Sequence, residues 1–163
     1  MSDQVSTVGF DQLENLLAEI SKSVGHTAAA KSILVPAARD AMKPALTAAK
    51  ANLFPGHGYD TGQLQRTLAI KARTTTSKDR RSKYIDSKDA VIAVVEANIN
   101  KIKGDKSDAR HIAVEFGTAN MAARPYLRPA LEATSGQVTE KLRANLAKGL
   151  EKFKASAPRK DTP

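Results

Sequence analysis

The chain of 163 residues contains no cysteine and no tryptophan, and aromatic residues make up only 4% of it. Without cysteine it cannot form disulfides, use a thiolate nucleophile or bind zinc through sulfur. Because aromatic residues are so few, we expect a core of Ala, Leu, Ile and Val, which packs well only where small side chains let elements approach closely. A chain of this length favours one domain rather than two.

Long hydrophobic runs and a secretory signal are also missing. No stretch approaches the ~18 consecutive apolar residues of a membrane helix. The segment Met1–Gly9 lacks the basic and apolar regions of a signal peptide. We therefore expect a soluble protein, made in the cytoplasm, with no membrane contact. A single domain is expected over residues 1–154, followed by a flexible polar tail over 155–163.

Acidic residues are fewer than basic ones, 17 against 26, which gives a formal net charge of +9. Such an excess favours non-specific affinity for polyanions. The Ser/Thr-rich segment 75–88 is basic and too long for a tight hairpin turn, so we interpret it as an exposed loop that orders on assembly. Either the loop is simply solvated, or it contacts DNA or an acidic protein surface. The candidate contact residues are Lys78, Arg80, Arg81 and Lys83.

Helical patterns dominate the first third of the chain. A capping-box-like start at Asp11 predicts an amphipathic helix that ends near Gly25. The Ala-rich stretch 28–53 predicts more helix, interrupted by Pro36 and Pro44. Because each proline removes a helical hydrogen bond, we expect kinks, or two helices that meet near Pro36.

The rest of the chain predicts strands and one long helix. Period-two alternation indicates strands over 67–74, 90–97 and 112–118, of which 90–97 is the most apolar and is expected to be central. Apolar residues mostly four apart predict a C-terminal helix over 131–153, with a candidate break at 134–136. The fold class expected is α+β, in which a small, mostly antiparallel sheet of three to four strands packs with N-terminal helices and a long C-terminal helix.

The third predicted strand leads into a turn. Ile112, Val114 and Phe116 alternate with Glu115, so a strand would direct these three side chains toward a core or a subunit contact and Glu115 the other way. Gly117 supplies the backbone freedom to leave the sheet.

Two prolines shape the segment that follows. Pro125 fixes a bend, and Pro129 suits the first turn of a helix, where a missing N–H costs nothing. Arg124, Tyr126 and Arg128 lie on this turn. Either the arginines tie the turn internally through charge-assisted bonds, or the turn presents them and the tyrosine to a neighbouring subunit. The internal partners would be Glu115 or Glu132.

The order E-F-G-T, then A-R-P-Y-L-R-P-A-L, within Val114–Ala133 resembles the tail-completion or head-tail joining family of long-tailed phages, the type named for gene product ten of a lambdoid phage. A weaker match lies in 55–68, where a proline, a short loop and Thr61-Gly62-Gln63-Leu64 lead into a strand, similar to the family's T-G-x-L pattern.

The resemblance implies a structural virion protein that forms a homo-oligomeric ring, expected to be a hexamer, at the phage neck. Its neighbours would be the head-closure (stopper) protein and a tail terminator or tail-tube protein. Genome DNA would pass through the channel with non-specific contact only. The interface candidates are Glu115, Phe116, Arg124, Tyr126 and Arg128.

Catalytic and cofactor chemistry is not indicated. His26, His57 and His111 lack metal-ligand spacing, and the chain has no P-loop, nucleophile elbow or G-x-G-x-x-G motif. The lone carboxylate of Glu115 is interpreted as an interface or ion-pair residue rather than a general acid or base. We therefore expect no enzyme, no metal site and no cofactor. The alternatives are a monomeric nucleic-acid-binding module that uses the basic loops, and a small hydrolase without a recognisable motif.

Overall fold

The structure is a computed structural model that describes residues 15–16, 18–19, 28–54, 62–83, 85, 91–97 and 110–156. Its helices are α2 (Ala28–Ala41), α3 (Lys43–Ala51), α4 (Gln63–Thr67), α5 (Arg110–Phe116) and α6 (Leu127–Ser156). Its strands are β1 (Leu68–Thr74) and β2 (Val91–Ala97), and η1 (Asp79–Arg81) is a short 3-10 turn between them. Asn15, Leu16, Ala18 and Glu19 are also helical. The chain is thus a mixed helix and strand protein with a long C-terminal helix, as expected.

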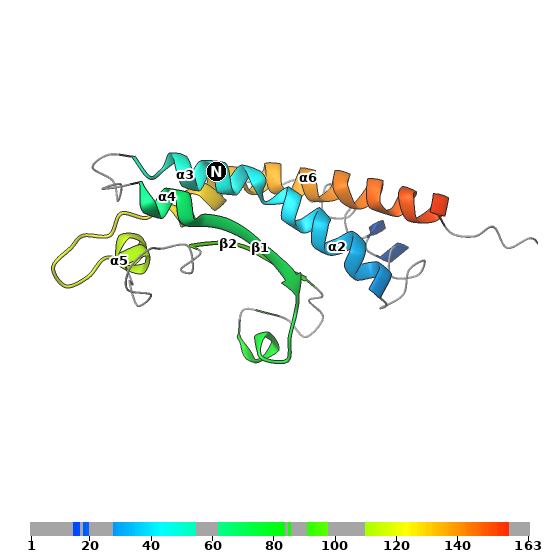
Figure 1. Ribbon diagram of the computed structural model, residues 1–163, viewed down its shortest axis with the longest axis horizontal. Helices are drawn as coiled ribbons and strands as arrows, with labels where there is room; N and C mark the ends of the chain where they lie inside the picture. Colours follow the sequence, from blue (N-terminus) through cyan, green and yellow to red (C-terminus); the bar gives the residue numbers. More distant parts are fainter. Residues whose placement is uncertain are drawn as a thin grey trace, which may run out of the picture.

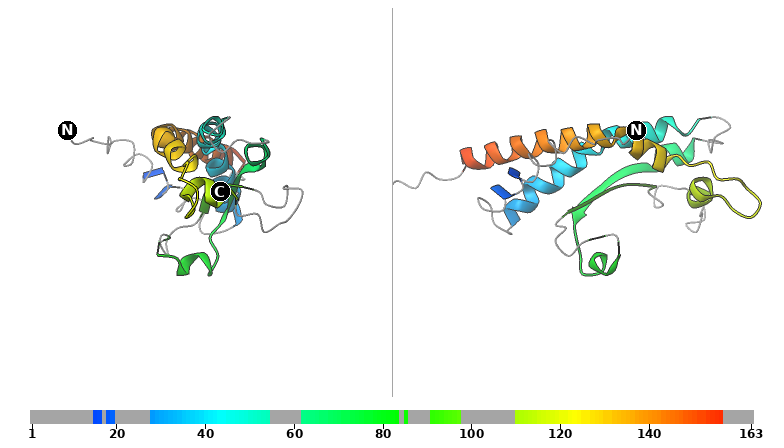
Figure 2. Two further views of the ribbon diagram at one scale, coloured as in Figure 1. Left: turned by 90° about the vertical axis from the view of Figure 1, so that its left-hand side faces the viewer. Right: turned by 180° about the vertical axis from the view of Figure 1, so that it is seen from behind.

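The elements form an elongated molecule with a helical layer and a β-hairpin beneath it (Figure 1). Helix α6 runs along α2 and α3, and both of these helices also contact the hairpin. Seen from behind, the two curved strands follow the underside of the helical layer, and η1 lies beyond their end (Figure 2). The hairpin therefore has one face against helices and one face open.

A stripe of mostly small residues lets α6 approach α2 and α3 closely. Every fourth residue from 33 to 53 is buried along these two helices and the residues that follow them. They are Ile33, Ala37, Ala41, Ala45, Ala49 and Leu53. Gly149 of α6 contributes to the same fit, because a Cβ there would lie 2.6 Å from Cγ2 of Ile33. Apart from Tyr126, an aromatic anchor that the composition did not predict, the hydrophobic core is built from small and aliphatic residues as expected.

Two hydrophobic clusters hold the layer together. The first joins α2 to the C-terminal half of α6. It consists of Ile33, Ala37, Leu146 and Leu150. The second, called here the Tyr126 cluster, joins α3, β1 and the start of α6. It consists of Ala49, Leu53, Leu68, Tyr126 and Ala130. The Tyr126 cluster is the one that positions the candidate site.

The sheet is a two-stranded antiparallel pair whose register runs from Leu68 opposite Ala97 to Thr74 opposite Val91. Leu68 and Ala72 are buried against the helices. The predicted strands 67–74 and 90–97 are confirmed to within one residue. Within the described ranges, the only strand that pairs with β2 is β1, so the central position predicted for β2 is not found.

The third predicted strand is wrong, because residues 110–116 form helix α5. Alternating apolar residues at 112, 114 and 116 fit a strand, but residues four apart also share one face of a helix. Ile112 and Phe116 form that shared face and are exposed, whereas Glu115 is buried. Glu115 is therefore internal rather than outward, and Val114 does not share a face with Ile112 and Phe116, as a strand would require. The described part of the chain contains two strands, not three or four.

The interruption of the helix lies beside Pro44, one of the two prolines named, and two helices do not meet near Pro36. Helix α2 continues through Pro36, and the junction with α3 falls at Met42. Pro36 has no N–H to donate to the carbonyl four residues earlier, that of Ser32. Both residues lie on the exposed side of α2. Pro44 occupies the first turn of α3, where the missing N–H is tolerated.

Two further expectations need correction. Thr61-Gly62-Gln63-Leu64 does not lead directly into a strand, because Gly62 adopts a left-handed φ of 68° and helix α4 precedes β1. Helix α6 is not broken at 134–136 and runs through Ser156, two residues into the expected tail. Pro129 does lie in its first turn. The predictions for residues 1–14, 20–27, 55–61, 98–109 and 157–163 lie outside the described residues.

Candidate functional site

The carboxylate of Glu115 on α5 binds the beginning of α6. Its Oε2 accepts hydrogen bonds from the backbone N–H groups of Tyr126 and Leu127, both at 2.9 Å. Its Oε1 accepts the backbone N–H of Arg128 at 3.1 Å. A helix leaves its first N–H groups without internal partners, and a carboxylate near the N-terminus also interacts favourably with the helix dipole. Glu115 thus caps α6 from a different helix.

The sequence explains why α6 needs this external cap. Tyr126, the residue before the helix, has no oxygen that can reach back to the first turn, unlike the Ser, Thr, Asp or Asn usual there. The first turn of α6 contains no acidic residue. Three of the four positions 126–129 donate to Glu115, and the fourth, Pro129, has no N–H to donate. Glu115 therefore satisfies every backbone donor that these four residues carry.

The chain between the two helices is a tight, hydrogen-bonded turn. Gly117 ends α5 with a left-handed φ of 76°, and its N–H donates to the carbonyl of Ala113 at 2.8 Å. Thr118 and Met121 exchange two backbone hydrogen bonds, and the N–H of Arg124 donates to the carbonyl of Val114 at 2.7 Å. A Cβ at Gly117 would lie 2.8 Å from the backbone nitrogen of Ala123, so glycine is required there for both conformation and space.

Tyr126 anchors this corner in the core. Its side chain is only 1% exposed within the Tyr126 cluster. The side-chain amide of Asn52 donates to the Tyr126 carbonyl at 3.0 Å, which ties the end of α3 to the start of α6. Burial, and then the negative charge of Glu115, raise the pKa of the Tyr126 hydroxyl to about 12.

Two other side chains of α5 are apolar and open to solvent. Ile112 is 52% exposed and Phe116 is 66% exposed. They are four residues apart and so lie on one face of the helix. The inner face carries Glu115 and Val114, of which Val114 packs against the Tyr126 cluster. We define the Ile112–Phe116 pair as the α5 face.

The structure corrects the predicted set of interface residues. Glu115 is 8% exposed and Tyr126 is buried, so neither side chain is presented at the surface of the single chain. Phe116, Arg124 and Arg128 are exposed, as an interface role requires. Glu115 does tie the turn internally, through hydrogen bonds from backbone N–H groups, which differ from the arginine side-chain bonds that the sequence suggested. Ile112 joins the candidates, and its spacing from Phe116 would have indicated it had a helix been assumed.

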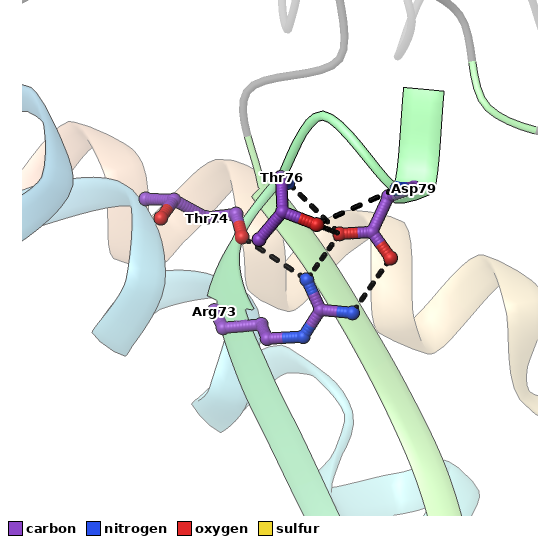
Figure 3. Close-up of polar contacts among 4 residues, drawn as sticks. All are labelled: Arg73, Thr74, Thr76 and Asp79. Atoms are coloured by element: carbon purple, nitrogen blue, oxygen red, sulfur yellow. Dashed lines mark hydrogen bonds and ion pairs between the residues drawn. The ribbon is translucent and has the colours of Figure 1, made fainter. Parts of the chain in front are cut away.

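The basic loop begins with a folded turn that pairs Arg73 with Asp79 (Figure 3). The Arg73 guanidinium forms a bidentate ion pair with the Asp79 carboxylate, in which Nη2 lies 2.7 Å from Oδ1. Asp79 Oδ2 also accepts the Thr76 backbone N–H at 2.8 Å and the Thr76 hydroxyl at 2.6 Å. Arg73 additionally donates to the carbonyl of Thr74 at 3.2 Å. These bonds fold the chain around η1.

Electrostatics favour the charged form of this pair. The Arg73 guanidinium, and then the Thr76 hydroxyl and N–H, hold the pKa of the Asp79 carboxyl well below its usual range. Of the predicted polyanion-contact residues, Lys78, Arg81 and Lys83 are exposed, and Arg80 lies within η1. The structure thus places all four on one turn. The T-x-x-D pattern of Thr76 and Asp79, which is similar to a capping box, is the sequence signal that would have revealed the turn.

Other kinds of site are not found in the described part of the chain. His111 lies on α5, and no three His, Asp or Glu side chains among the described residues are grouped closely enough to hold a metal ion. None of the described helices has both the length and the apolar character needed to cross a membrane.

Comparison of the chain with protein-family models, with curated protein sequences and with solved structures finds no match. Two features of the described residues are candidates for a functional role. They are the α5 face, next to the helix that Glu115 caps, and the basic turn at the end of the hairpin.

Proposed function

We propose that this chain is a structural protein of a phage neck, where copies assemble into a ring that joins the DNA-filled head to the tail. The ring is expected to be a hexamer between the head-closure protein and a tail terminator or tail-tube protein. The proposal includes a sheet of three to four strands in each subunit, of which the described residues form two. The chain would act by shape and contact, without catalysis, in the virion.

The observation that carries the proposal is the exposed α5 face. Phe116 lies within the E-F-G-T segment that resembles the tail-completion family, and with Ile112 it presents an aromatic and an aliphatic side chain to solvent. Aromatic side chains are enriched among the residues that dominate binding energy at protein interfaces. A folded single chain has no packing reason to expose this pair, so a protein partner explains it better than solvation does.

The anchoring of α5 supports the same role. A seven-residue helix is too short to be stable alone. Here Glu115 fixes it to α6, and the N–H of Arg124 fixes the following turn to Val114. Because the α5 face is held in place before association, binding orders few additional groups and loses little conformational entropy.

Further exposed residues on the turn and near the start of α6 are the remaining candidates for the interface. Arg124 and Arg128 are exposed on the turn and at the start of α6, and Leu131 is a further exposed apolar residue on α6. An apolar centre with a polar rim is the usual composition of a protein interface. Glu115 and Tyr126 then act from inside, as residues that position the interface rather than touch the partner.

The test replaces Phe116→Glu and supplies the variant to phage that lack the native protein. Because Phe116 is exposed, the subunit should fold with a melting temperature near wild type, while the count of joined particles falls. Arg124→Glu should also reduce joining. Val94→Glu is the matched control, because it places the same charge at an exposed apolar residue of the sheet. Wild-type joining with Phe116→Glu would refute the interface, and absence of any effect of the wild-type protein on joining would refute the neck role.

A further inference from the structure

We propose that the turn formed by residues 75–83, called here the basic tip, binds the phosphodiester backbone of double-stranded DNA without reading its sequence. This inference concerns a surface separate from the α5 face, and it holds whether or not the chain is a neck protein.

The basic residues of the tip differ from those of β1, the strand that leads to it, in whether they form ion pairs. On β1, Lys71 pairs with Glu96 at 3.2 Å and Arg73 pairs with Asp79. The tip itself carries four basic residues and one carboxylate, a net charge of +3. Lys78 and Arg81 are exposed and have no ion pair among the described residues. The basic residues of the strand are therefore paired, whereas Lys78 and Arg81 of the tip have no paired carboxylate among the described residues.

The single carboxylate of the tip is turned inward. Asp79 is 16% exposed, and its two oxygens accept hydrogen bonds from Arg73 and Thr76. Its charge is thus used to fold the turn and does not offset the outward basic residues. The next carboxylates of the loop, Asp86 and Asp89, follow the tip in the sequence. Residues 75–83 are thus folded in the single chain, unlike the loop expected to order only on assembly. Because the turn is folded before binding, presenting Lys78 and Arg81 costs little conformational entropy.

The composition of the tip favours nucleic acid over an acidic protein. Of its nine residues, four are Lys or Arg, four are Ser or Thr, and the remaining one is Asp79. Lys, Arg, Ser and Thr side chains, together with backbone N–H groups, are the usual ligands of DNA phosphates. A protein interface needs an apolar centre, and the tip has no apolar residue. The contrast with the α5 face, which is apolar, indicates two surfaces for two kinds of partner.

The position of the tip leaves it accessible to a large ligand. It lies beyond the end of the hairpin, on the side away from the helical layer, in each view of the molecule (Figures 1 and 2). Because the tip would contact only the phosphodiester backbone of DNA, its affinity would not depend on the base sequence along a duplex. If the chain does form a ring, several tips would face one duplex, and their combined affinity would exceed that of a single tip.

The experiment measures binding of the full chain to a short fluorescent DNA duplex by anisotropy over a series of salt concentrations. The tip variant is Lys78→Ala with Arg81→Ala. The matched control is Lys148→Ala with Lys152→Ala, which removes the same charge from exposed positions of α6. We expect the wild-type dissociation constant to lie at roughly 10⁻⁶–10⁻⁴ M. The tip variant should bind about tenfold more weakly. The slope of the logarithm of the binding constant against the logarithm of salt concentration should be less steep by about 0.9 for each phosphate contact that is lost.

Three results would overturn the proposal. The first is no binding of the duplex by the wild-type chain at low salt, and the second is an equal loss of affinity in the tip variant and the control, which would indicate net charge alone. The third is tighter binding of polyglutamate than of DNA at the tip, which would indicate an acidic protein partner. Melting temperatures verify that both variants fold, and glutamine replacements at the same positions serve if the alanine variant does not. The phage joining assay with Phe116→Glu leaves the tip intact, so the neck role and DNA binding can fail separately.

Discussion

The carboxylate of Glu115 accepts the backbone N–H of Tyr126 at 2.9 Å, although the two residues belong to different helical segments eleven positions apart. This bond and its two neighbours turn α5, the intervening turn and the start of α6 into one unit. Tyr126 is in turn buried beside α3 and β1. The exposed α5 face is thus connected to the core through the buried carboxylate of Glu115, together with the packing of Val114 against the Tyr126 cluster.

The first prediction concerns that carboxylate. Glu115→Ala leaves three N–H groups without their acceptor, so we expect the free energy of unfolding to fall by about 2–4 kcal/mol. Glu115→Gln keeps one oxygen acceptor and should lose about half as much. Urea denaturation measures both. Glu132→Ala is the control, because it removes an exposed glutamate from α6, the helix that Glu115 caps. A similar loss in all three variants would contradict the capping role.

Much of the fold could be predicted from the sequence, because its elements follow simple periodicities. β1, β2 and α6 were found where alternation or four-residue spacing predicted them. α5 could not be separated from a strand, because its apolar residues at 112 and 116 face solvent in the single chain. The spacing of apolar residues predicts which face of an element is buried in the core. That prediction fails where the apolar residues contact a partner instead of the core. That failure is itself an argument for an interface.

The second prediction compares two glycines. Gly117→Ala forces a left-handed φ on alanine and places its Cβ 2.8 Å from a backbone nitrogen. We expect a loss of about 2–3 kcal/mol in the free energy of unfolding. Gly136→Ala, on α6, meets nothing within 4 Å, and alanine is the better helix former, so a gain of about 0.5–1 kcal/mol is expected. Equal effects of the two changes in thermal or urea unfolding would contradict this account.

The third prediction concerns Asp79 and pH. Because Arg73 holds the pKa of the Asp79 carboxyl below its ordinary value, the pair stabilises the folded tip fully above that value and loses this effect as pH falls below it. Asp79→Asn should speed hydrogen exchange of the Thr76 amide at neutral pH, whereas Asp40→Asn, at an exposed ion pair on α2, should not. Unchanged Thr76 exchange in the first variant would show that other contacts fold the tip.

The candidate sites were only partly predictable, for two physical reasons. The basic residues 78, 80, 81 and 83 were identified from charge alone, and they do lie on one turn. The acid that folds this turn, Asp79, was missed because its partner Arg73 comes from the strand. Glu115 and Tyr126 were predicted to face a partner, yet both are internal, because capping of one helix by another depends on tertiary structure. Local sequence patterns do not encode that relationship.

The last prediction uses the hydroxyl of Tyr126, a residue that is buried as a whole. Its pKa is raised to about 12 in the folded chain, whereas an unfolded tyrosine ionises near pH 10. Since the folded value is the higher one, Tyr126 contributes stability that is complete below about pH 10 and is lost as pH rises toward about 12. Tyr126→Phe should therefore remove part of the decline in unfolding free energy over this range, while other alkaline transitions remain. Urea unfolding at several alkaline pH values gives the difference between the two proteins, and tyrosinate absorbance identifies the group that ionises last. Identical pH profiles for the two proteins would show that the Tyr126 hydroxyl ionises as readily in the folded chain as in the unfolded one.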